Sequence, residues 1–296
     1  MSEISEVKNR IKGVSETQKI TNALYLVSSA KVRKAREELD KTAPYFRGIR
    51  KEIKSIFKTI NHDRIESKYL YPENDHMKNA ACGYLVITAD KGMAGAYNHN
   101  VLKRAENEFS GHEKHKLFVV GDLGREYLSA KGYNVAENFT FAALKPTLAV
   151  ARKIADVLLE GYVEGEYSKL FILYTDIADG GIIIKSTRIL PFHTAEFIPE
   201  KDKIKEEFEF VPSREAVLDN LVPSYICGYV YSSLVDSYCA EQNARLAAMK
   251  SASDNANEIL SRLTRDYNRA RQSEITTEIS EISSGAKFQR SKKNDG

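Results

Sequence analysis

The sequence predicts an α/β domain of Rossmann-like type, with a mostly parallel sheet, inserted between two long helices that form an antiparallel coiled coil. Apolar residues recur every three or four positions through residues 3–60, and a second long helical pattern fills residues 213–288. Between them, short apolar runs alternate with helical stretches. We therefore divide the chain into an N-terminal coiled-coil helix (1–60), a polar linker (61–80), an α/β domain (81–200), a charged connector (201–212), a C-terminal coiled-coil helix (213–288) and a polar tail (289–296).

The N-terminal helix carries the clearest pattern. Most positions of its seam, spaced alternately three and four residues apart, are apolar: Ile4, Val7, Ile11, Val14, Gln18, Thr21, Tyr25, Ser28, Val32, Ala35, Leu39, Thr42, Phe46, Ile49, Ile53, Ile56 and Ile60. A period of 3.5 residues is typical of a left-handed coiled coil. At about 1.5 Å per residue this helix is roughly 80 Å long, too long for the inside of one compact domain. It is predicted to be a rod, with a kink near Ala43 because Pro44 interrupts the helical hydrogen bonds.

Charge is balanced in total but not along the chain. The net charge is +3 over 296 residues, which does not demand nucleic acid. Residues 1–60 contain fourteen Lys and Arg against seven Asp and Glu, whereas residues 213–288 contain eight against ten. A basic helix and a mildly acidic helix attract each other, and the surplus positive charge faces either acidic partners or solvent.

The cysteine content and the hydropathy limit the cellular compartment in which the protein is expected. Three cysteines give no disulfide framework, and Cys227 and Cys239 are predicted to lie about 18 Å apart along one helix, too far for a disulfide. Reduced thiols indicate a cytosolic protein. No apolar run approaches the roughly 20 residues that span a bilayer, so we expect a soluble chain that works against a membrane complex at most.

The central region reads as four strands and three helices. Strands are predicted at 83–88, 116–120, 168–175 and 181–190, the last at an edge of the sheet. Helices are predicted near 97–109, from about 124 to 131, and at 146–163, where Pro146 suits a first turn.

The C-terminal helix begins after Pro212 or afresh at Pro223. Small residues crowd its seam from about 237 to 256, which allows a close approach to a second helix. After Arg271 the apolar stripe moves to another face, at Ile275, Ile279 and Ile282. One partner helix cannot cover both faces, so the last turns are predicted to meet something outside this chain.

The sequence contains only weak signals for a catalytic or ligand-binding site. The loop Gly92-Met93-Ala94-Gly95 follows a strand and invites a phosphate-site interpretation, but it lacks the G-x-G-x-x-G spacing, and a tight strand-to-helix turn is the default. Asp90 and Asp176 each end a strand and are interpreted as helix or turn caps. His112 and His115 lie in a polar loop without a second ligand pair. We predict no catalytic residue, no cofactor site and no metal site.

A basic cluster at residues 31–36 could bind phosphates. Acidic residues flank it, which favours a solvated face or a face toward a partner. Two alternative functions stay open: a nucleotide-binding α/β enzyme acting through Gly92–Gly95, and a structural coiled-coil protein that self-associates or binds DNA.

Four stretches carry a family resemblance: VSETQKITNALYLVSSAKV (14–32), TADKGMAGAYN (88–98), EQNARLAAMKSASDNA (241–256) and NRARQSEITTEISEISSGA (268–286). The sequence closely resembles the gamma subunit of F-type ATP synthases, of the bacterial type. It departs from the family pattern D-R-G-L-C-G-G-L-N at Lys91, Met93, Ala94, Ala96 and Tyr97. It lacks the cysteine-bearing insert of chloroplast-type gamma subunits, so redox regulation of that kind is not expected.

The resemblance implies a central rotor shaft that catalyses nothing alone. Its expected partners are three alpha and three beta subunits, the epsilon subunit and the membrane ring of c subunits, with no nucleic acid. Its expected place is the cytoplasmic face of the cell membrane, held there through the complex. Rotation of the ring by ion flow would turn the shaft, whose asymmetry drives the beta subunits through different nucleotide affinities.

Carried over residue by residue, the resemblance implies contacts with the surrounding alpha and beta subunits. The positions are Lys19, Leu24, Arg245, Gln272, Thr276 and Glu278, joined by the shifted apolar face of Ile275, Ile279 and Ile282. Leu24 replaces a methionine often found there, a swap that conserves volume.

Overall fold

The computed structural model describes residues 3–59, 67, 69, 81–111, 114–178, 181–192, 211 and 213–294. The predicted linker (61–80) and connector (201–212) therefore lie almost wholly outside the described residues. The described chain falls into two compact units. The α/β unit comprises residues 28–245, and the terminal coil unit comprises residues 1–27 and 246–296.

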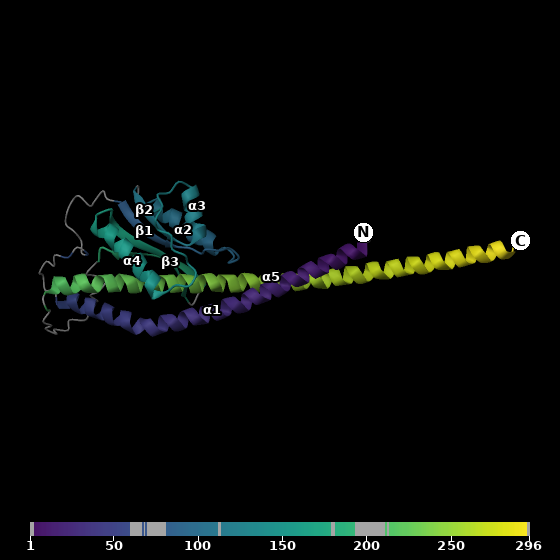
Figure 1. Ribbon diagram of the computed structural model, residues 1–296, viewed down its shortest axis with the longest axis horizontal. Helices are drawn as coiled ribbons and strands as arrows, with labels where there is room; N and C mark the ends of the chain where they lie inside the picture. Colours follow the sequence, from purple (N-terminus) through teal and green to yellow (C-terminus); the bar gives the residue numbers. More distant parts are fainter. Residues whose placement is uncertain are drawn as a thin grey trace. The chain divides into compact units, whose positions relative to one another are not determined.

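Two long helices run through both units. Helix α1 spans Glu3–Thr59 and continues through Pro44, and helix α5 spans Arg214–Asn294 with Pro223 inside it (Figure 1). The C-terminal helix thus starts just after Pro212 and does not restart at Pro223. It also runs six residues past its predicted end at 288, because residues 286–294 contain neither Gly nor Pro to stop it.

A four-stranded sheet forms the centre of the α/β unit, in the order β2-β1-β3-β4. The strands are β1 (Ala81–Ile87), β2 (His115–Val120), β3 (Tyr167–Ala178) and β4 (Gly181–Leu190). Strand β1 pairs parallel with β2 and with β3, and β4 pairs antiparallel with β3. The predicted mostly parallel sheet is confirmed, with β4 at the edge.

Both faces of the sheet are covered, as buried parallel strands require. Helices α2 (Tyr97–Phe109) and α3 (Asp122–Ala130) pack on the face that holds Tyr84, Val86 and Val119. Helix α4 (Leu148–Val163) and the first part of α5 pack on the opposite face, against Leu85, Ile87 and Ile172. Alternate residues of β1 therefore enter two different cores.

Local chemistry sets the ends of the short helices. Thr147 caps α4, with its Oγ1 accepting from the Val150 N–H at 3.3 Å, so the helix begins two residues after Pro146. Gly121 begins α3 at φ 98°, and a Cβ there would meet the Thr88 carbonyl at 2.5 Å. Gly124 packs equally close to Thr88, which brings α3 onto the end of β1.

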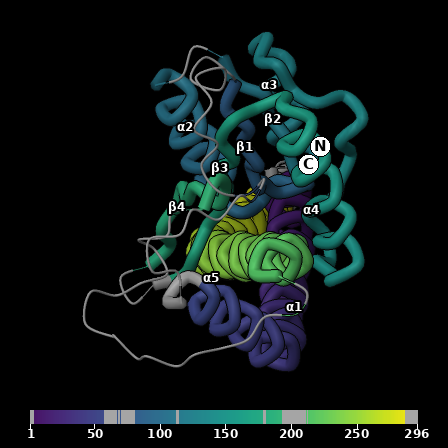
Figure 2. The backbone as a smooth tube through the Cα atoms, turned by 90° about the vertical axis from the view of Figure 1, so that its left-hand side faces the viewer, coloured from purple at the N-terminus to yellow at the C-terminus, as the bar shows by residue number. Residues whose placement is uncertain are grey.

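Within the α/β unit, α5 lies between the sheet and the second half of α1 (Figure 2). Ile49, Ile53 and Ile56 of α1 are buried in one core with Leu218, Val222, Ile226 and Val230 of α5. The ring of Phe46 lies against Gly228, where any Cβ would clash with it. A large side chain set against a glycine lets the two helices come close.

The predicted seam of α1 is confirmed with one exception. Its members are buried or half-buried wherever their side chains are described, except Tyr25, which is 40% exposed. Leu24, three residues after Thr21, is half-buried instead. The seam therefore steps by three and then four residues here, because a straight helix drifts against a strict 3.5-residue repeat.

No described helix holds a segment of sufficient length and hydropathy to span a bilayer.

Candidate functional site

The crevice between the carboxyl ends of β1 and β3 is where an α/β fold of this topology would bind a ligand. The chain goes from β1 to β2 on one side and crosses back to β3 on the other, so the strand order reverses at this point. Helix α5 crosses the crevice and closes it. Eight described residues line what is left, with no room for a water molecule among them: Ile87, Thr88, Tyr97, Ala143, Leu234, Ser237, Tyr238 and Glu241.

Buried hydrogen bonds hold α5 in this crevice. Ser237 of α5 accepts from the Thr175 N–H at its Oγ (3.0 Å) and from the Tyr97 hydroxyl at its carbonyl (3.2 Å). Burial raises the pKa of Tyr97 far above its ordinary value, so the phenol stays a neutral donor. The helix thus occupies, with its own backbone and side chains, the position that a nucleotide would take in an α/β enzyme.

Arg245, about two helical turns after Ser237, makes the next polar contact between α5 and the residues that follow β1. Its Nη1 forms an ion pair with Glu241 Oε1 at 2.5 Å, and its Nη2 donates to the Gly92 carbonyl at 3.0 Å and to the Lys91 carbonyl at 3.4 Å. The two charged side chains are only 10% and 5% exposed. Burial raises the pKa of Glu241, and the guanidinium opposes that shift.

The glycine-rich loop is the tight strand-to-helix turn that the sequence favoured. Met93 and Gly95 adopt left-handed φ values of 63° and 58°, and the Tyr97 N–H donates to the Ala94 carbonyl at 3.2 Å. The carbonyl oxygens of Lys91 and Gly92 in this loop accept hydrogen bonds from Arg245.

The two carboxylates that the sequence placed at strand ends, Asp90 and Asp176, differ in position and role. Asp90 accepts from the backbone N–H groups of Asp122 (3.2 Å), Ala143 (3.0 Å) and Leu144 (2.8 Å), so it is the predicted cap and joins three loops. Asp176 lies inside β3, opposite Ile183 of β4, so the prediction that it ends a strand is wrong. It accepts from the Ile177 N–H at 2.7 Å and is ion-paired with Lys185 of β4. That ion pair was not foreseen, because it depends on the register of β3 against β4.

Among the described residues no group of three or more His, Cys, Asp or Glu could hold a metal ion. His115 stacks on Phe109 with ring centroids 5.2 Å apart. Its predicted neighbour His112 lies outside the described residues. The three cysteines are free and buried, in agreement with the prediction of no disulfide.

The terminal coil unit is joined by polar side chains. Ser253 Oγ donates to Asn22 Oδ1 at 2.8 Å, and Gln18 Nε2 donates to Asn257 Oδ1. The order of these pairs along the two helices is that of an antiparallel coil. Gln18 was predicted on the seam, but its partner Asn257 was not; a polar residue at a seam position was the available signal.

Exposure separates the predicted contact residues into two groups. Arg245 is buried in the α/β unit, whereas the others belong to the terminal coil unit. There Leu24 is half-buried in the seam and Lys19 is exposed. Every residue from Arg271 to Ala286 is exposed, including Gln272, Thr276 and Glu278, and Ile275, Ile279 and Ile282 are 46%, 62% and 71% exposed.

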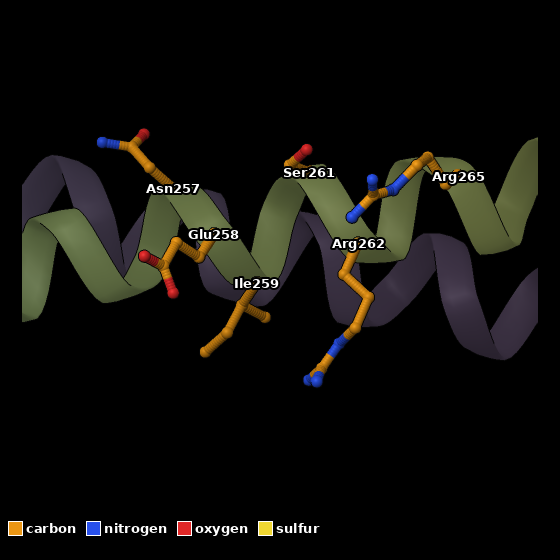
Figure 3. Close-up of a pocket in the computed structure, with 6 residues that line it drawn as sticks. All are labelled: Asn257, Glu258, Ile259, Ser261, Arg262 and Arg265. Atoms are coloured by element: carbon orange, nitrogen blue, oxygen red, sulfur yellow. The ribbon is translucent and has the colours of Figure 1, made fainter.

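A surface hollow of the terminal coil unit lies on a polar face of α5 and is not an enclosed site. It is lined by Asn257, Glu258, Ile259, Ser261, Arg262 and Arg265, all from one helix (Figure 3). Figure 3 shows these side chains spread along the helix, without convergence on one point. Such a surface provides charge but no cage for a small ligand.

These features define a class of protein: a long antiparallel coiled coil with an α/β domain whose ligand crevice is filled by the chain's own helix. Comparison with known proteins gives the family. The family model described as ATP synthase matches residues 3–287. The ATP synthase gamma chain of Acetivibrio thermocellus is 37% identical over 295 residues, covering 97% of this chain and 99% of that one. The chain belongs to the family of ATP synthase gamma chains.

Further relatives agree. The sodium ion specific ATP synthase gamma chain of Acetobacterium woodii is 34% identical, covering 96% of this chain and 97% of that one. A chain in the structure of the Euglena gracilis mitochondrial ATP synthase (OSCP, F1 and c-ring) has the same fold, with a TM-score of 0.66. It is 15% identical, covering 98% of this chain and 95% of that chain.

Proposed function

We propose that the chain is the central rotor shaft of an F-type ATP synthase. It couples ion-driven rotation of a membrane c-ring to conformational change, and hence to ATP synthesis or hydrolysis, in a hexamer of three alpha and three beta subunits. The observation that carries the proposal is the pairing of full-length similarity to gamma chains with an α/β domain fastened to an 81-residue helix.

In this role the chain is a non-catalytic subunit. The filled crevice supports that view, since a nucleotide could enter only by displacing α5 and its bonds to Tyr97 and Thr175. The same observation speaks against the alternative of a nucleotide-binding enzyme acting through Gly92–Gly95.

The exposed end of α5 is the proposed bearing surface. Ile275, Ile279 and Ile282 follow one another at steps of four and three residues and form one apolar face. Three exposed isoleucines in line are costly in water and gain free energy when a partner covers them. Gln272, Thr276 and Glu278 lie among them and offer polar contacts to the same alpha and beta subunits.

The remaining proposed partners are the epsilon subunit and the c-ring, which hold the chain at the cytoplasmic face of the cell membrane. Neither a nucleic acid nor a cofactor is needed for this role.

The test is ATPase activity after mixing the chain with alpha and beta subunits. We expect the chain alone to be inactive, and the mixture to yield one stable complex with steady turnover at one copy per three beta subunits. A chain that never joins alpha and beta subunits from related bacteria contradicts the proposal, and so does ATP hydrolysis by the chain alone.

A further inference from the structure

Arg245 stands at the boundary of the α/β unit. It is the last residue of α5 that belongs to this unit, and the unit's other helix enters at Ser28. Its ion pair with Glu241 on its own helix and its two hydrogen bonds to the loop that connects β1 with α2 lie inside the unit. The side chain therefore links α5 to the α/β domain at the point where the domain's hold on that helix ends.

The chemistry of the contact suits arginine specifically. A guanidinium can direct one nitrogen at a carboxylate and another at two carbonyls from a single planar group, whereas an ammonium is a point donor on a flexible stem. Gln242 Nε2 also donates to Glu241 Oε1 at 3.3 Å, which helps to fix the carboxylate. With so little exposed surface, the pair is shielded from salt and water.

The β1–α2 loop, on the other side of the contact, contains a backbone conformation that has to be held in place. Met93 holds a left-handed φ of 63° that a residue with a Cβ rarely adopts, and its side chain is 61% exposed, so no packing of its own explains the conformation. Gly92 and Lys91, directly before it, are the residues whose carbonyls accept from Arg245. Ala94, directly after it, is buried in the core beneath α2.

We propose that Arg245 is a positioning residue that fastens the β1–α2 loop to α5, so that the α/β domain and α5 turn as one body up to this residue. The proposal rests on the rotor function and assigns the charge of Arg245 a role within the chain. It differs from the contact with beta subunits that the family resemblance implies for this position. Loss of the fastening would free the β1–α2 loop and loosen the end of the domain's contact with α5, while the buried core still holds the earlier turns of the helix to the sheet.

The first experiment reads the loop directly. Because all three native cysteines are buried, a spin label on Met93→Cys in the full-length chain reports on the loop alone. We expect Arg245→Gln to raise the mobility of the label several-fold and Arg245→Lys to raise it less. Glu241→Gln should act in the same direction as Arg245→Gln. Lys250→Gln, an exposed change on the same helix, serves as the control and should leave the spectrum unchanged.

The second experiment reads coupling in the assembled enzyme in vesicles. We expect Arg245→Gln to lower the number of ions transported per ATP hydrolysed about twofold or more, with partial recovery in Arg245→Lys. A role confined to stability would lower transport and hydrolysis together and leave their ratio unchanged, which would overturn the proposal.

The two readouts separate this proposal from the rotor function. A label as immobile in Arg245→Gln as in the parent chain overturns the fastening and leaves the rotor function standing. A chain that never joins alpha and beta subunits overturns the rotor function, while a mobile label still supports the fastening itself.

Discussion

The two units bury different kinds of residue. In the α/β unit the contact between α1 and α5 is made by large, fully buried side chains such as Ile53, Leu218 and Ile226. In the terminal coil unit the buried residues are mostly small or polar, among them Thr21, Ser253 and Ala256. Among the described residues there, only Met249 and Leu263 are large apolar residues that are buried, whereas others, such as Leu26 and Ile282, are exposed. The first unit therefore has an extensive apolar core between its helices, whereas the second buries little apolar surface within the chain.

The largest expected effect is on the packing of the α/β unit. Ile53→Ala removes a side chain with no exposed surface, and we expect the free energy of unfolding in urea to fall by about 2–5 kcal/mol. Ile275→Ala, in the terminal coil unit, is the matched control and should cost less than about 0.5 kcal/mol in the free chain. Equal losses from the two changes would contradict the comparison.

The second effect concerns assembly. Ile279→Asp should leave unfolding of the free chain unchanged, because the side chain is exposed, and weaken binding to alpha and beta subunits by about 2 kcal/mol or more. Thr277→Asp places the same charge two residues away on the other side of the helix and should weaken binding less. A complex of Ile279→Asp with normal yield and activity would show that this face is not the bearing surface.

Two glycines should respond with opposite signs. A Cβ at Gly228 collides with the Phe46 ring, so Gly228→Ala should destabilise the chain by about 1–3 kcal/mol. A Cβ at Gly13, in the terminal coil unit, meets nothing within 4 Å, so Gly13→Ala should stabilise it by about 0.5–1 kcal/mol. Urea unfolding of both variants tests the contrast, and stabilisation by Gly228→Ala would show that the two helices separate easily there.

A fourth prediction concerns pH. Burial, with the nearby Asp176 carboxylate adding to it, raises the pKa of Asp236 to about 6, while Ser232, Arg36 and Lys185 oppose the shift. A carboxyl group with a raised pKa in the folded state favours unfolding once it ionises, so its cost is absent near pH 4 and complete above about pH 7. Asp236→Asn should therefore stabilise the chain by about 1–3 kcal/mol at pH 7.5 and scarcely at pH 4.

The measurement is the free energy of unfolding against pH for the parent chain and Asp236→Asn. A constant difference from pH 4 to pH 8 would contradict the shifted ionisation.

The smallest effect is expected at the polar pairs of the terminal coil unit. Ser253→Ala removes the hydrogen bond to Asn22 and should cost about 0.5–1.5 kcal/mol. In a double-mutant cycle with Asn22→Ala, urea unfolding should give a coupling energy of that order. Additive losses would mean that the pair does not stabilise the coil.

Sequence patterns were sufficient to predict the helices and strands whose apolar residues recur at a regular spacing. The 3.5-residue spacing of α1 and the apolar runs of the strands predicted the coil and the sheet, including the edge position of β4. Periodicity reports which face of an element is apolar, and that is enough when the partner face is apolar too.

Sequence patterns were insufficient for the polar contacts. The ion pair of Arg245 with Glu241 could be suspected from their spacing of four residues, but the bonds of Arg245 to the β1–α2 loop join residues more than 150 positions apart. The filling of the crevice by α5 depends in the same way on where the end of the chain returns to the sheet. Such contacts follow from the fold and leave no local signature.

The exposed last turns of α5 also distinguish the free chain from a chain that has been incorporated into the complex. From Arg271 to Ala286 every residue is exposed, so little packing supports the helix there. Amide hydrogens of these turns should exchange with solvent within seconds in the free chain, and proteases should cut there first. Once enclosed, the same amides would exchange slowly. Unassembled copies of the chain would then expose a segment that a protease can cut, whereas assembled copies would not.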